Sequence, residues 1–148
     1  MAAISLPITL VSAGAAALIN TWLAIRVGRA RGTAKVSIGD GGDMALIARM
    51  RAHSNFVEYT PFVLILIGLI ELNIGSALWL WGVAAVYLLG RVAHGLGMDG
   101  LPRGRQIGTL STLVIMVGLG IYAAIFPLLP GNAAPHILAP TEAAPAKG

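Results

Sequence analysis

A polar stripe runs into a long apolar segment and combines residue types that bind small anions. The stripe contains Arg51, Ser54, Asn55 and Glu58. Their spacing of i, i+3, i+4 and i+7 places all four on one face of a helix. The chain becomes apolar around Glu58, where a carboxylate costs about 2.5–3.5 kcal/mol at the centre of a membrane helix and less near its end. We therefore expect a cation, Arg91 or Arg51, to pair with Glu58.

More groups able to do chemistry are expected at the same end of the molecule. They are Arg91 and His94 on the third apolar run, Arg105 beside the fourth, and Arg26, Arg29 and Arg31 after the first. These cations outnumber the acids near them, so one ion pair with Glu58 leaves several guanidinium groups without a counter-ion. A cation-rich pocket inside an apolar bundle suits a small, flexible polyanion, and it also suits anionic lipids. The residue types alone leave both ligands open.

The composition identifies an integral membrane protein. Of the 148 residues, 57% are hydrophobic and 11% are charged, whereas about 25% of the residues in a soluble domain are charged. The mean hydropathy is +0.82, and a water-soluble domain of this length could not bury so much apolar surface. The chain has no cysteine, so thiol chemistry would need a thiol that the ligand brings.

Four apolar runs predict four membrane-spanning helices. They cover residues 2–25, 56–72, 77–92 and 107–129. A spanning helix needs about 20 residues, and the second run reaches that length only if its helix begins before Phe56. The sequence thus predicts an all-α fold over residues 1–130, an up-down four-helix membrane bundle, followed by an Ala/Pro-rich disordered tail at 131–148. The first run lacks the basic start of a secretory signal, so we expect it to be retained.

The distribution of positive charge predicts the orientation in the membrane. Nine of the ten Lys and Arg residues lie in or beside the first and third loops: Arg26, Arg29, Arg31, Lys35, Arg49, Arg51, Arg91, Arg103 and Arg105. The positive-inside rule makes that side cytoplasmic and places both termini in the periplasm, as for a bacterial inner-membrane protein. Cations grouped beside apolar spans form no basic groove, so we expect no nucleic-acid partner.

Two local features concern the second helix. Asp43 follows a glycine-rich loop at 39–43 and is a candidate N-cap of that helix. The same loop lacks the ligand spacing and terminal glutamate of a calcium loop, so no metal is expected. Pro61 lies just beyond Glu58 and is expected to kink the helix, because proline removes a backbone donor.

Two motifs together resemble the MAPEG family, the membrane-associated proteins in eicosanoid and glutathione metabolism. The first is Arg51-Ala-His-Ser-Asn55-x-x-Glu58-x-x-Pro61, and the second is Gly90-Arg-Val-Ala-His94 on the next span. The resemblance covers the four spans and their loops. It is nearest to the branch with microsomal prostaglandin E synthase and microsomal glutathione transferase.

The resemblance implies a homotrimer of four-helix subunits with glutathione in each subunit interface. Arg51, Asn55 and Glu58 match glutathione-contacting residues, and Arg91 and His94 match a polar pair on the third helix. Arg105 matches the arginine that stabilises the glutathione thiolate. One arginine after the first span, best assigned as Arg29 rather than Arg26 or Arg31, matches the cation at the glycyl carboxylate.

The sequence departs from the prostaglandin synthase pattern at three positions. Met98 stands where that pattern has a tyrosine, Ser54 where it has an arginine, and Gln106 where it has a serine. These departures argue against prostaglandin synthase activity.

The expected function is glutathione transfer to hydrophobic electrophiles, or glutathione-dependent reduction of lipid hydroperoxides. A free thiol has a pKa of about 8.5, and fixed cations or a helix N-terminus lower it. Arg105 supplies the cation at the start of the fourth helix. Two alternatives remain: a non-enzymatic binding or scaffold protein, and a bundle that binds anionic lipids. His94 has an alternative role as a hydrogen-bonding residue between helices.

Overall fold

The computed structural model describes residues 5–130, and it contains four long helices in that range. These are α1 (Pro7–Ala34), α2 (Met44–Ile74), α3 (Leu78–Gly97) and α4 (Pro102–Ile125), with a final 3₁₀ turn η1 (Phe126–Leu128). All four are long and apolar enough to cross a membrane. The predicted all-α fold with four spans is confirmed. The predicted disordered tail, 131–148, lies outside the described residues.

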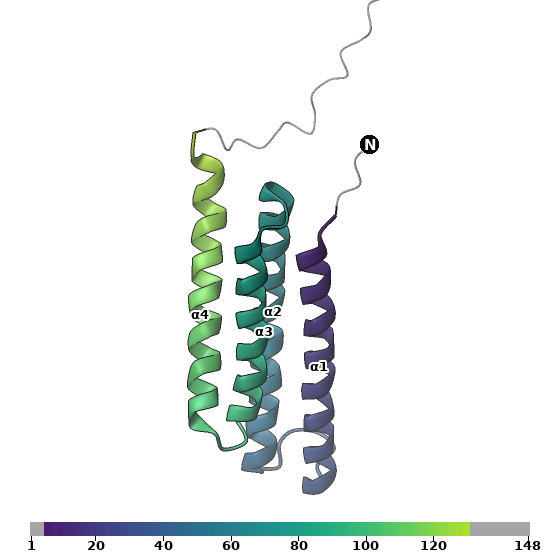
Figure 1. Cartoon of the computed structure of the whole chain (residues 1–148). Coiled ribbons are helices and arrows are strands. Elements are labelled where there is room, and N and C mark those ends of the chain that lie inside the picture. The colour runs from purple at the N-terminus through teal and green to yellow at the C-terminus, as the bar shows by residue number, and fades with distance from the viewer. Residues whose placement is uncertain (1–4, 131–148) are drawn as a thin grey trace, which may run out of the picture.

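The four helices alternate in direction, so the α1–α2 loop and the α3–α4 turn lie at the same end of the bundle. Figure 1 shows the start of α1 and the end of α4 at one end, which we call the terminal end. The loop between α1 and α2 and the turn between α3 and α4 lie at the other, which we call the loop end. The predicted up-down order is therefore confirmed, whereas the homotrimer stays a prediction.

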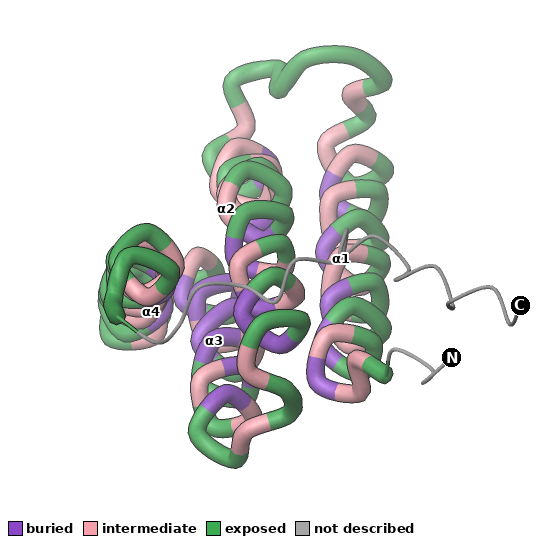
Figure 2. Tube along the Cα trace, turned by 90° about the horizontal axis from the view of Figure 1, so that it is seen from above, coloured by how far each residue is buried: buried purple, intermediate pink, exposed green. Residues whose placement is uncertain are grey.

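The bundle is open rather than closed around one axis. The helices α2 and α3 occupy the middle, while α1 and α4 lie on different sides and do not contact each other. Figure 2 shows this separation when the bundle is viewed from above. One apolar cluster fills the terminal half, with Ile8, Val63, Ile67, Leu80 and Tyr87 among its members. A smaller cluster, Ala16, Leu23, Ala52 and Phe56, joins α1 to α2 nearer the loop end.

The start of α2 follows from its cap, and the helix is longer than its apolar run. The side chain of Asp43 accepts a hydrogen bond from the backbone nitrogen of Leu46 at 2.7 Å, which confirms the predicted N-cap. The helix has 31 residues, whereas α3 has 20. It begins well before Phe56, as its short apolar run required, and it continues through Pro61.

A buried carboxylate that sequence reasoning overlooked fixes α1 at the terminal end. Glu71 of α2 is 1% exposed. It accepts hydrogen bonds from the backbone nitrogens of Ile8 and Thr9 at 3.0 and 2.8 Å. The hydroxyls of Thr9 and Ser76 each donate to it at 2.7 Å. Glu71 thus caps the unsatisfied first-turn amides of α1, which have no partner within their own helix.

Glycines let α3 and α4 approach closely at the loop end. A Cβ at Gly97 would lie 2.6 Å from the carbonyl carbon of Gly104 and 2.8 Å from Cα of Arg105. A Cβ at Gly108 would lie 2.8 Å from the backbone nitrogen of His94. Only glycine fits at such contacts, and small residues four apart are typical of tightly packed membrane helices. This packing fixes where α4 begins relative to the end of α3.

Candidate functional site

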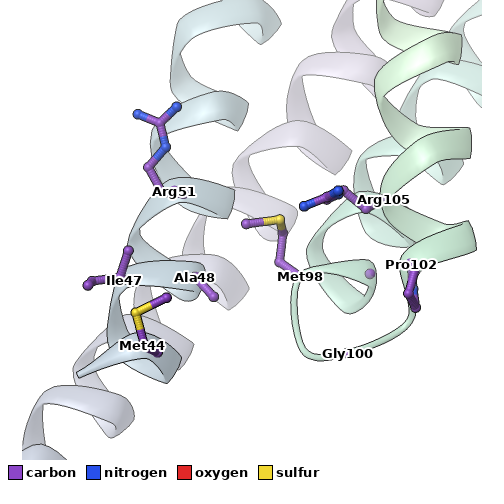
Figure 3. Close-up of a pocket in the computed structure, with 9 residues that line it drawn as sticks. Met44, Ile47, Ala48, Arg51, Met98, Gly100, Pro102 and Arg105 are labelled. Carbon is purple, nitrogen blue, oxygen red and sulfur yellow. The ribbon is translucent and has the colours of Figure 1, made fainter. Parts of the chain in front are cut away.

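A cavity at the loop end is formed by the start of α2, the end of α3 and the start of α4. It has a volume of about 380 Å³. Its lining consists of Met44, Ile47, Ala48, Arg51, Gly97, Met98, Gly100, Pro102 and Arg105. Figure 3 shows Arg51 on α2 and, on the other side, Arg105 extending from α4 toward Met98. Arg51 and Arg105, which the sequence predicted to share a site, therefore line one cavity.

The charged residues of the lining, Arg51 and Arg105, are both basic, and the lining contains no acid. Arg105 extends toward Met98, whereas the guanidinium group of Arg51 points away from Arg105 (Figure 3). Within residues 5–130, neither arginine forms an ion pair. Helix α4 also begins here with Pro102, and its first turn contains no acid that would offset the positive end of its dipole. The surroundings thus favour an anionic ligand.

Asn55 of α2 and Arg91 of α3 contact each other but do not line this cavity. Arg91 is 1% exposed, and its Nη2 donates to Oδ1 of Asn55 at 2.6 Å. Its Nη1 donates to the hydroxyl of Thr112, also at 2.6 Å. Its Nε is buried and has no hydrogen-bond partner in the described part of the chain. The guanidinium is thus held by neutral groups, and no carboxylate within residues 5–130 pairs with it.

His94 bridges α3 and α4. Its Nδ1 lies 3.4 Å from the carbonyl oxygen of Arg105 and 3.3 Å from the hydroxyl of Thr109. The side chain is buried. This placement fits the alternative role of His94 as a hydrogen-bonding residue between helices. It also brings His94 close to the backbone of Arg105.

Comparison with known proteins places this arrangement in a family. The model of the MAPEG family matches residues 9–125. The chain is a member of the MAPEG family. It is also similar to the inner membrane protein YecN of Escherichia coli K12, with 35% identity over 106 residues that cover 68% of this chain and 80% of the relative. YecN of Escherichia coli O6:H1 strain CFT073 matches to the same extent.

Membership of the MAPEG family confirms the predicted resemblance and the membrane location, but one expected contact is wrong. Glu58 is exposed and forms no ion pair within the described residues. The reason is the direction of the stripe: Arg51 and Glu58 face outward, and only Asn55 turns toward the bundle. Arg91 is satisfied by Asn55 and Thr112 instead of a carboxylate.

The arginines at the end of α1 in this MAPEG chain differ in what they contact. Arg26 pairs with Asp99, and Arg31 donates to the carbonyl oxygen of Gly39 at 2.7 Å. Arg29 is exposed, has no ion pair within residues 5–130 and does not line the cavity. The structure thus places Arg51 and Arg105 on opposite sides of one cavity, joins Asn55 to Arg91, and leaves Arg29 and Glu58 apart from the cavity.

Sequence reasoning missed two polar residues that organise the site of this MAPEG protein. Thr112 receives a hydrogen bond from Arg91, and Asp99 binds two arginines. A threonine inside the apolar fourth run and an acid between two basic segments were the available signals. No group of three His, Cys, Asp or Glu side chains within residues 5–130 could hold a metal ion.

Proposed function

We propose that this protein binds glutathione in the loop-end cavity and activates its thiol. The observation that carries the proposal is the pair Arg51 and Arg105, which line one cavity with no acid in its lining. We further propose that the activated thiol attacks hydrophobic electrophiles or reduces lipid hydroperoxides. The similarity to YecN supports a bacterial inner-membrane location, and the charge distribution supports a cytoplasmic site with periplasmic termini.

Charge and size both support glutathione as the ligand. Glutathione has a net charge of about −1 at neutral pH and about −2 as a thiolate, following ordinary side-chain pKa values. Two arginines in the lining match this charge. Small-molecule sites have volumes of about 300–1,000 Å³, and this cavity of about 380 Å³ lies within that range.

Arg105 has the position that thiol activation requires. It lies in the first turn of α4, where the helix dipole adds to its own charge. A fixed cation and a helix N-terminus both stabilise a thiolate and lower the pKa of the thiol. The thiolate sulfur then forms a bond to the electrophilic carbon while the leaving group departs with its electron pair.

A homotrimer would explain the residues that stand apart from the cavity in one chain. Arg29 and Glu58 are exposed on the outside of α1 and α2. We propose that a neighbouring subunit covers these faces and that glutathione then contacts both side chains. Arg91 acts through Asn55, and His94 acts through the α4 backbone, since both side chains are buried.

The thiolate itself provides the test. We expect purified protein in detergent, mixed with glutathione, to show thiolate absorbance in the ultraviolet. Arg105→Ala should abolish this signal, because the nearest fixed cation is removed. Arg103→Ala is the matched control: it removes an equal charge from the first turn of α4 but does not line the cavity.

Each other result has a defined meaning. Thiolate absorbance that persists in Arg105→Ala contradicts the role of Arg105. Glutathione binding without turnover of an aryl halide or a hydroperoxide would show that the protein is a non-enzymatic binding or scaffold protein. Failure to bind glutathione, with anionic lipid retained through purification, replaces the proposal with a lipid-binding bundle.

Arg91→Met is expected to change stability little and to weaken binding. The change removes a buried charge, which favours the folded state, but it leaves Oδ1 of Asn55 without its donor, which costs about 1–3 kcal/mol. The same change frees Asn55 from its hydrogen bond, so glutathione affinity should fall by about tenfold, the effect of losing one good hydrogen bond. Thermal unfolding and a glutathione titration measure the two effects. An unchanged glutathione affinity would show that the Asn55–Arg91 hydrogen bond does not contribute to the binding site.

A further inference from the structure

Asp99 gathers two arginines from different helices at the edge of the cavity. It lies in the turn between α3 and α4 and pairs with Arg26 of α1. Its Oδ1 also accepts a hydrogen bond from Nε of Arg49 of α2 at 3.3 Å. Arg26 donates in addition to the carbonyl oxygen of Gly95 at 3.0 Å and lies over the ring of Trp22. We call Arg26, Arg49 and Asp99 the Asp99 cluster.

The Asp99 cluster lies next to residues that line the cavity but does not itself line it. The chain neighbours of Asp99 are Met98 and Gly100, and both line the cavity. Arg49 stands two positions before Arg51 on α2. On the other side, Gly97 packs directly against the backbone of Arg105. One carboxylate therefore connects the helix that carries Arg51 to the turn that leads to Arg105.

From this geometry we infer that Asp99 is a positioning residue, which sets the separation of Arg51 and Arg105 across the cavity. The inference rests on the proposed function for its chemical consequence. Asp99 does not itself contact the ligand, because it does not line the cavity and both its carboxylate oxygens are bound by arginines. Without Asp99, the α3–α4 turn loses its contacts with Arg26 and Arg49, and the position of Arg105 becomes less fixed.

A purely electrostatic role makes a different prediction, which allows a sharp test. If Asp99 acted only through its charge, Asp99→Asn would lower the thiol pKa of bound glutathione, and Arg26→Gln or Arg49→Gln would raise it. If Asp99 positions the turn, all three variants should raise that pKa. We expect a rise of about half a unit, which is a threefold loss of thiolate at a pH below the pKa.

The experiment combines two measurements on the full chain in detergent. The first is thiolate absorbance against pH for the wild type, Asp99→Asn, Arg26→Gln and Arg49→Gln with glutathione. The second needs no ligand: amide hydrogen exchange of the turn, where Leu101 donates to Gly97 and Arg105 donates to Leu101. Exchange there should become about tenfold faster in Asp99→Asn. Asp40→Asn, an exposed acid at the same end, is the matched control.

The outcomes separate this inference from the proposed function. A raised thiol pKa in all three variants, together with faster exchange, supports the positioning role. A lowered pKa in Asp99→Asn, or unchanged exchange and pKa, overturns it. A wild type without thiolate absorbance contradicts the proposed function, and the exchange measurement then decides alone whether Asp99 holds the turn. If Asp99→Asn does not fold, Arg49→Gln removes only the contact between Arg49 and Asp99. The thiol pKa rises in that variant under either role, so its hydrogen exchange decides: faster exchange of the turn supports the positioning role, and unchanged exchange overturns it.

Discussion

Gly97→Leu is expected to separate α3 from α4 and to destroy the cavity. Even a single Cβ at this position would meet the backbone of Gly104 and Arg105, and backbone atoms cannot move aside as a flexible side chain can. Overpacking of a tight contact costs about 1–3 kcal/mol, and more where the backbone must shift. We expect a loss of about 3 kcal/mol in unfolding free energy and no glutathione thiolate signal. Denaturant unfolding in detergent and the absorbance measurement test both.

Gly82→Leu is the matched control for this change. Gly82 also lies in α3, and a Cβ there would meet nothing within 4 Å. It should leave the unfolding free energy within about 0.5 kcal/mol of the wild type, as for surface substitutions generally. Equal effects of the two leucines would show that helix composition, and not the contact between α3 and α4, determines stability.

Glu71→Ala is expected to loosen α1 from the rest of the bundle. The change removes four hydrogen bonds, two from the first-turn amides of α1 and two from hydroxyls. Side-chain hydrogen bonds in membrane proteins contribute on average about 0.6 kcal/mol each. We therefore expect a loss of about 2–3 kcal/mol, measured by unfolding in detergent, and faster hydrogen exchange at Ile8 and Thr9.

Glu58→Ala provides the control, because both glutamates lie on α2. Glu58 is exposed and has no ion pair among the described residues. Its replacement should leave stability nearly unchanged and weaken glutathione binding. Glu71→Ala should lower the stability and leave glutathione binding nearly unchanged. A destabilised Glu58→Ala would mean that its carboxylate has a structural partner after all.

Two kinds of feature could be predicted from the sequence. The number of spans followed from the apolar runs, and the start of α2 followed from its length requirement and from Asp43. The presence of both Arg51 and Arg105 in the lining of one cavity followed from the motifs and the loop lengths. These features depend on local chemistry or on the order of the spans along the chain.

The face of each helix that points into the bundle could not be predicted. In a membrane, residues that face lipid and residues that face the core are equally apolar, so periodicity carries little information. The expectation that an acid among apolar residues needs partners was correct for Glu71 but was applied to Glu58. The partners of Glu71 include the amides of Ile8 and Thr9, which lie 63 and 62 positions away in the sequence. Only the packing of α1 against α2 brings them together.

The unequal lengths of the helices determine how ligands can approach the cavity. At about 1.5 Å per residue, α1 and α2, with 28 and 31 residues, reach about 42 and 46 Å, whereas the hydrocarbon layer is about 30 Å thick. The 20 residues of α3 match that thickness. The first turns of α2, which carry Met44 and Arg51, therefore extend into the headgroup region. Under the proposed function, glutathione would then reach the cavity from water without crossing the hydrocarbon layer, and an apolar electrophile dissolved among the acyl chains would meet it at the boundary of that layer.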